Sequence, residues 1–153
     1  MNLKITTKDE AIKAIDELKN KIICGFAGIG KSYLAKNKEG FIDLESTPFK
    51  KNWDLYTDVA IHMQKNGYTP MLSCHKELRQ MLREKGADYV VVLPKSEHKQ
   101  NYIERYIKRG NDEKFIKLFE DNFEKFIQEI MEDEKNIIIL DEGYSTLEDL
   151  LLL

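Results

Sequence analysis

The chain has 153 residues, of which 42% are hydrophobic and 33% charged, with a formal net charge of −3. This composition is typical of a globular protein with its own core, and the lack of a basic excess argues against wholesale coating of nucleic acid. No apolar run resembles a membrane span, and no linker or repeat divides the chain, so we expect one cytoplasmic domain over residues 1–153.

The hydrophobic pattern predicts helices that alternate with short apolar strands. Thr7 to Glu10 form a capping box, which marks a helix start, and Ile12, Ile15 and Leu18 would share the inner face of that helix. The expected strands cover residues 21–24, 41–44, 69–74, 89–93 and 136–140. The expected helices cover residues 32–36, 53–66, 75–85, 97–109 and 112–133, and a second capping box at 145–148 predicts a short terminal helix.

Strands that are apolar throughout and separated by helices indicate a parallel sheet covered on both faces. The sequence therefore predicts a three-layer α/β fold with about five parallel strands. Ligands of such sheets bind beyond the carboxyl ends of the strands, so the residues that follow each strand are the candidates for function.

Residues 25–32 carry the most specific motif, because Gly25-Phe26-Ala27-Gly28-Ile29-Gly30-Lys31-Ser32 matches the phosphate-binding pattern G-x-x-x-x-G-K-[ST]. Glycines let the backbone wrap a polyphosphate, the lysine reaches its β- and γ-phosphates, and the serine hydroxyl ligates Mg²⁺. The sequence thus predicts ATP and Mg²⁺ as cofactors. The residues expected to bind ATP are Gly25, Gly28, Ile29, Gly30, Lys31, Ser32 and Tyr33.

An acidic segment follows the second expected strand. Asp43 is expected either to order the water shell of Mg²⁺, together with Ser32, or to accept the proton of an attacking hydroxyl. Glu45 and Ser46 would then contact the phosphoryl acceptor. A solvated strand end with a helix cap is the simpler interpretation of the same residues.

The four arginines form two pairs at i, i+4 spacing, which places both guanidinium groups of a pair on one helix face. Arg105 and Arg109 follow the fourth strand and are expected to neutralise a phosphoryl group in transfer. His75 and Arg79 follow the third strand, and His75 is expected to hydrogen-bond phosphate or Mg²⁺-bound water on the acceptor side. Surface charge pairing for the arginines, and a helix-start role for His75, are the alternatives.

These motifs resemble those of the small P-loop kinases, of the nucleoside monophosphate kinase and shikimate kinase type. Residues 25–32 match the ATP loop of that family, and Asp43 with Glu45 resembles its D-x-[DE] element, which binds acceptor and metal. Arg79 resembles the arginine that holds the acceptor, and Arg105 with Arg109 resembles the lid arginines that close on ATP.

The D-x-E-S and Y-x-E-R-Y-x-x-R-G segments also resemble small kinase-like proteins seen in phage genomes. The resemblance implies a P-loop NTPase fold and transfer of the γ-phosphoryl of ATP to a small acceptor, with a nucleotide or nucleoside favoured. No D-G-[FY]-P-R element follows the third strand, which sets the chain apart from adenylate kinases.

Two other functions fit the same loop. A polynucleotide 5′-kinase would need a basic groove that leads to Asp43, for which Lys50, Lys51 and Arg79 are the candidates. A non-catalytic nucleotide-binding or NTPase module would act through a partner protein, and the exposed face of the Phe-rich helix at 112–133 is its candidate surface.

Overall fold

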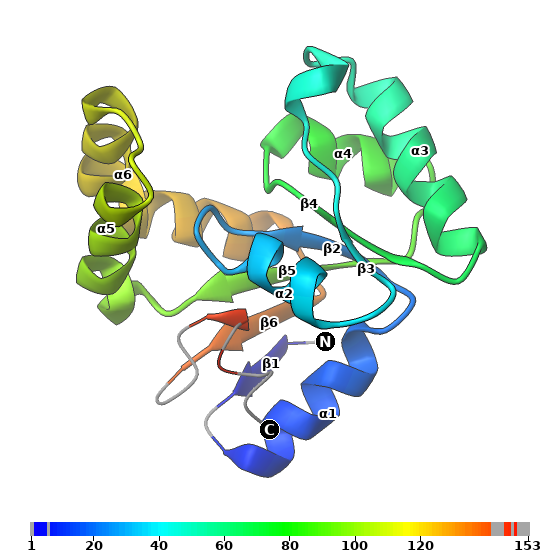
Figure 1. Cartoon of the computed structure of the whole chain (residues 1–153), viewed down its shortest axis with the longest axis horizontal. Helices are drawn as coiled ribbons and strands as arrows, with labels where there is room; N and C mark the ends of the chain where they lie inside the picture. Colours follow the sequence, from blue (N-terminus) through cyan, green and yellow to red (C-terminus); the bar gives the residue numbers. More distant parts are fainter. Residues whose placement is uncertain (1, 6, 142–145, 148, 150–153) are drawn as a thin grey trace.

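A single parallel sheet organises the computed structural model, which describes residues 2–5, 7–141, 146, 147 and 149 (Figure 1). The terminal capping box is not tested, because Ser145 and Glu148 lie outside these residues. The elements in chain order are β1 (Asn2–Ile5), α1 (Lys8–Leu18), β2 (Ile22–Gly25), α2 (Lys31–Asn37), β3 (Phe41–Asp43), the 3-10 turn η1 (Thr47–Phe49), α3 (Trp53–Lys65), β4 (Thr69–Leu72), α4 (Lys76–Glu84), β5 (Tyr89–Pro94), the 3-10 turn η2 (Ser96–His98), α5 (Lys99–Lys108), α6 (Glu113–Asp133) and β6 (Ile137–Leu140).

The sheet has the strand order β1-β6-β5-β2-β4-β3, and every neighbouring pair is parallel. The expected α/β class and parallel sheet are confirmed, but the expected number of strands is wrong: the described residues form six. The additional strand is β1, which pairs only with β6, Leu3 lying opposite Ile138. A four-residue strand at the sheet edge carries too short a pattern to be recognised without its partner.

The central strands are buried along their length, as their apolar sequences predict. β2 and β4 are fully buried, and β5 is buried from Val90 onward. Right-handed crossovers with this strand order place α1 and α2 on one face and α3, α4 and α6 on the other. In Figure 1, α2 lies in front of the sheet and the second half of α6 passes behind it, which is consistent with the expected three-layer arrangement.

Side-chain caps start the helices where the sequence places them. The hydroxyl of Thr7 accepts the N–H of Glu10 at the start of α1, and the carboxylate of Asp112 accepts the N–H of Phe115 at the start of α6. The predicted inner face of α1 is only partly right, because Ile12 is 45% exposed while Ala11 and Ala14 fill the core. Small side chains let α1 approach the sheet closely, and a hydrophobicity pattern alone does not reveal this.

The chain changes direction across the sheet at β2. It runs from β2 out to β3, returns to β4 beside β2, and then crosses to β5 on the other side of β2. In open α/β sheets, ligands bind at the carboxyl ends of the strands where such a reversal occurs. The end of β2, where residues 25–30 lead into α2, is therefore the position to examine. None of the helices in the described ranges combines the length and the hydropathy that a membrane crossing requires.

Candidate functional site

The segment between β2 and α2 forms a tight loop built on two glycines. Gly28 and Gly30 take the left-handed region, with φ of 82° and 103°, and Gly30 directly precedes α2. The N–H of Phe26 donates to the carbonyl of Val92, so the loop begins against the end of β5. Glycine is required at position 28 for a second reason, because a Cβ there would meet Tyr106 Cε1 at 2.7 Å.

Lys31 folds back over this loop. Its Nζ donates a hydrogen bond to the carbonyl of Gly25 at 3.0 Å, and the side chain is partly buried. Burial is the main cause that lowers the pKa of Lys31 below its ordinary value, while nearby Cys74 and Asp43 act in the opposite direction. Because an ammonium group has three donors, two remain for an anion in the loop.

Ser32 and Asp43 lie together at the carboxyl end of β3. The Ser32 hydroxyl donates to Oδ2 of Asp43 at 2.8 Å, joining the first turn of α2 to the last residue of β3. Hydroxyl and carboxylate oxygens are ligands that Mg²⁺ accepts, usually with waters and substrate phosphates completing the shell. Within the described residues no three His, Cys, Asp or Glu side chains cluster to hold a metal alone. The pair therefore fits a metal bound jointly with a phosphate ligand.

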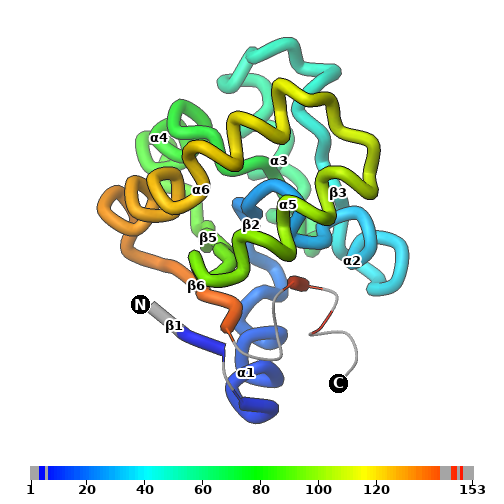
Figure 2. Tube along the Cα trace, turned by 90° about the vertical axis from the view of Figure 1, so that its left-hand side faces the viewer, coloured from blue at the N-terminus to red at the C-terminus, as the bar shows by residue number. Residues whose placement is uncertain are grey.

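The helix α5 contacts the outer side of the loop. Arg105 Nε donates to the carbonyl of Gly28 at 2.9 Å, and the hydroxyl of Tyr106 donates to the carbonyl of Ala27 at 2.8 Å. Arg109 is exposed, and its guanidinium lies 6.0 Å from the centre of the Tyr106 ring. Figure 2 looks from the side of α5 and α6 and shows α5 crossing in front of the end of β2. Both expected arginines thus lie beside the loop.

A cavity of about 480 Å³ opens beyond β3 and β4. Its lining combines two lysines, an aromatic ring, an imidazole, two hydroxyls and one carboxylate, from Ser46, Thr47, Lys50, Lys51, Trp53, His75 and Glu77. Ser46 lies three residues after Asp43, so their Cα atoms are within about 11 Å of each other. The cavity lining therefore begins on the segment that follows β3, three residues beyond Asp43. It contains two of the expected acceptor-binding residues, Ser46 and His75.

His75 connects the cavity to the loop electrostatically. Its ring lies 5.2 Å from the Trp53 ring, tilted by 36°. Partial burial is the main cause that lowers the pKa of His75; Glu77 opposes this shift, and the charges of Lys31 and Lys51 add to it. A lowered pKa keeps the imidazole neutral at pH 7, so it can donate or accept a hydrogen bond there.

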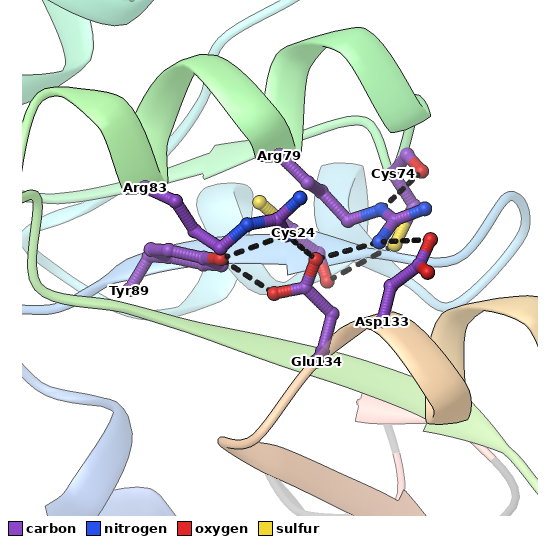
Figure 3. Close-up of polar contacts among 7 residues, drawn as sticks. All are labelled: Cys24, Cys74, Arg79, Arg83, Tyr89, Asp133 and Glu134. Carbon is purple, nitrogen blue, oxygen red and sulfur yellow. Dashed lines mark hydrogen bonds and ion pairs between the residues drawn. The ribbon is translucent and has the colours of Figure 1, made fainter.

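Arg79 occupies a different environment from the one the sequence suggests. Its side chain is buried, with Nε donating to the carbonyl of Cys74 at 3.1 Å and a terminal nitrogen 2.6 Å from Glu134. Figure 3 shows Arg83 and Tyr89 bound to the same carboxylate, while Asp133 pairs with Arg79. Arg79 does not line the cavity. Its contacts instead join α4 to the residue that follows α6.

Three further expected residues differ in exposure. Tyr33 is 44% exposed on α2, and Glu45 is exposed beyond β3. Ile29 is fully buried, its N–H donates to Phe26 within the loop, and its carbonyl accepts the N–H of Leu147 at 2.7 Å. The N–H of Ile29 is therefore engaged inside the turn.

Sequence reasoning missed Tyr106, Trp53 and Glu134. Tyr106 stands between the two arginines of the Y-x-E-R-Y-x-x-R-G segment, where its position one residue after Arg105 was the available signal. Glu134 carried no signal in the sequence, because its partners Arg79, Arg83 and Tyr89 are 55, 51 and 45 residues away. Comparison with family models and with curated proteins finds no match to this chain.

Proposed function

We propose that the protein is an ATP-binding phosphotransferase that moves the γ-phosphoryl group of ATP to a small acceptor. The observation that carries this proposal is the juxtaposition of Lys31, Ser32 and Asp43 at the reversal point of the sheet, with Ser32 and Asp43 hydrogen-bonded at 2.8 Å. A loop that only turned the chain would need neither the lysine nor the hydroxyl–carboxylate pair.

In this proposal the loop binds the donor. Lys31 directs its two remaining donors to the β- and γ-phosphates, and the start of α2 adds its N–H groups to the same phosphates. Arg105 and Arg109 approach from α5 and offset the charge that develops on the transferred group. Ser32 and Asp43 would hold Mg²⁺, which would supply charge neutralisation on the phosphates.

The chemical step then requires a base near the acceptor, and Asp43 is the proposed one. The acceptor oxygen forms a bond to the γ-phosphorus as the bond from that phosphorus to the β,γ-bridging oxygen breaks. ADP leaves with the electron pair, and the acceptor proton passes to the Asp43 carboxylate. The Ser32–Asp43 hydrogen bond is exposed, and Asp43 lies three residues before Ser46 of the cavity lining, which supports this assignment.

The cavity is proposed as the acceptor site. A volume of about 480 Å³ is in the range of small-molecule pockets. Trp53 offers an aromatic face for a base, and Lys50 with Lys51 offers charge for a phosphate, so a nucleotide is favoured over an uncharged acceptor. Ser46 and His75 supply the hydrogen-bonding groups expected of the acceptor site.

The proposal is tested by incubating the protein with Mg²⁺-ATP and a panel of nucleosides and nucleoside monophosphates, and by detecting ADP and phosphorylated acceptor together. Lys31→Ala should abolish product formation, whereas Lys36→Ala, which removes an exposed lysine from the same helix, should not. Equal product formation by Lys31→Ala and wild type would refute the proposal. ATP binding without turnover of any acceptor favours the non-catalytic module instead.

The polynucleotide 5′-kinase stays the second candidate, because Lys50 and Lys51 line the cavity that is proposed as the acceptor site. Its expected groove is not continued by Arg79, which is buried in the contact with Glu134. A 5′-hydroxyl oligonucleotide that is phosphorylated, and that competes with a mononucleotide, favours this candidate. Failure to bind or to compete excludes it.

A further inference from the structure

We propose that Tyr106 is a positioning residue that holds the phosphate loop in its binding conformation. This inference rests on the proposed function, because it concerns how residues 25–32 present themselves to a phosphate. Its observation is separate, however: the contacts are between α5 and the backbone of the loop, not between the loop and Asp43.

Tyr106 meets the loop in two ways. Its hydroxyl donates to the carbonyl of Ala27 at 2.8 Å, and its Cε1 lies 2.7 Å from the point where a Cβ on Gly28 would stand. The ring thus fills the space that any side chain at position 28 would need. The positive φ of Gly28 and the ring of Tyr106 are two parts of one arrangement.

Consecutive residues of α5 accordingly bind consecutive carbonyls of the loop, since Arg105 contacts Gly28 just as Tyr106 contacts Ala27. In a trans peptide group the C=O and the following N–H point in opposite directions. When the Ala27 carbonyl is held toward α5, the N–H of Gly28 is turned away from α5. That donor is then available to an anion on the opposite side of the loop.

The rest of the structure makes Tyr106 a rigid support. The side chain is fully buried, and its ring centre lies 5.1 Å from Phe115 and 5.0 Å from Phe119, both on α6. The Phe115 ring meets it edge-on, at 89°. Because α5 and α6 lie side by side in both views, the hairpin acts as the base against which the loop is held (Figures 1 and 2).

Tyr106→Phe is the variant that tests this role, since it keeps the ring and removes the hydroxyl. Isothermal titration gives the dissociation constants of Mg²⁺-ATP and of Mg²⁺-tripolyphosphate. The second ligand has the phosphates but neither base nor sugar, so it reports on the loop alone. We expect both dissociation constants to rise by the same factor, roughly threefold to tenfold. Tyr89→Phe is the matched control, because it removes a partly buried tyrosine hydroxyl that donates to Glu134, and it should leave both constants unchanged.

A second readout separates positioning from general stability. Backbone amide hydrogen exchange in residues 26–30 should become faster in Tyr106→Phe than in Tyr89→Phe, at equal exchange in the central strands. Phe115→Leu, which loosens the support of the Tyr106 ring from the far side, should weaken both ligands about twofold to threefold.

The outcomes divide cleanly. The role of Tyr106 is overturned if Tyr106→Phe binds both ligands with wild-type affinity. It is also overturned if this variant binds ATP more weakly but tripolyphosphate as well as wild type. In both cases the proposed function stands. If Tyr106→Phe does not fold, unchanged affinity in Phe115→Leu overturns it equally. A wild-type protein that binds neither ligand refutes the proposed function first, and this inference with it.

Discussion

The hydroxyl of Ser32 donates a hydrogen bond to the carboxylate of Asp43 at 2.8 Å, linking the start of α2 to the end of the outer strand β3. The two residues are 11 positions apart in the chain. They meet because β2 and β3 are parallel strands of one sheet, so their carboxyl ends lie at the same edge. Substitution of either residue tests what this contact contributes.

Asp43→Asn should separate binding from chemistry. The amide still accepts the Ser32 hydroxyl but has neither the charge to hold a cation nor the basicity to take a proton. We expect ATP to bind within a fewfold of wild type in the absence of Mg²⁺, while the rate of phosphoryl transfer falls by about 10²- to 10⁴-fold. Single-turnover product formation measures the rate, and Asp121→Asn, on the exposed side of α6, is the control. Full activity in Asp43→Asn would remove Asp43 from the mechanism.

Replacing Glu134 should destabilise the fold strongly. The carboxylate is 2% exposed and the partner Arg79 3%, so Glu134→Gln removes the buried counter-ion at 2.6 Å and leaves Arg79 with the more distant, partly exposed carboxylate of Asp133 at 3.7 Å. We expect the free energy of unfolding to fall by about 3 kcal/mol, measured by urea denaturation. Asp121→Asn removes an exposed ion pair with Lys117 and should cost less than about 1 kcal/mol.

The double variant Arg79→Met with Glu134→Leu tests the role of Arg79. With both buried charges gone, much of the lost stability should return. Binding of ATP and of the acceptor should then match wild type, because Arg79 does not line the cavity. A folded double variant that binds ATP but no acceptor would instead support the acceptor-binding role predicted from the sequence.

Nucleotide binding should weaken at alkaline pH through Lys31. Burial lowers the pKa of Lys31 in the folded protein below that of the unfolded chain, which is about 10.4. As pH rises through the lowered pKa, the ammonium loses its proton and its attraction for phosphate, so the dissociation constant for ATP rises. Between the two pKa values the unfolded chain holds more protons, so this group makes the free energy of unfolding rise with pH.

Bound phosphate favours the charged form of Lys31, so ATP binding at alkaline pH, where the free protein has begun to lose this proton, should take up protons. Calorimetric titrations in buffers with different ionisation enthalpies measure this uptake. Lys36→Ala should retain it. Uptake that persists undiminished in Lys31→Ala would assign the effect to another group.

The fluorescence of Trp53 should change when a ligand binds in the cavity. Trp53 is the single tryptophan of the chain and lies in the cavity lining, 5.2 Å from the His75 ring. Stacking of a base on its indole should quench the emission, whereas ribose 5-phosphate, which has no base, should not. Lys50→Ala combined with Lys51→Ala should weaken a nucleoside monophosphate more than the corresponding nucleoside. Emission that does not respond to any acceptor phosphorylated by the enzyme would place the acceptor elsewhere.

Local patterns predicted most of the elements. Thr7 caps α1 as expected, α6 begins one residue after its expected start, and the apolar runs correspond to β2, β3, β4, β5 and β6 within a few residues. The predictions failed where contacts with other parts of the chain determine the structure. β1 exists as a strand through β6, more than 130 residues away in the chain, and Ile12 is exposed because alanines make the closest contact of α1.

By itself, the sequence determined the parallel α/β class and singled out the loop at residues 25–32, because hydrophobic periodicity and glycine spacing are local properties. The tertiary structure decided what surrounds that loop. It brought Asp43 to Ser32 and Tyr106 to Gly28, and it buried Arg79 against Glu134. Which helix faces which strand end depends on strand order and crossover hand, and these are set by packing of the whole chain. The two arginine pairs have identical spacing in the sequence, but the tertiary structure places them in different surroundings. Arg105 and Arg109 lie beside the loop, whereas Arg79 and Arg83 bind Glu134.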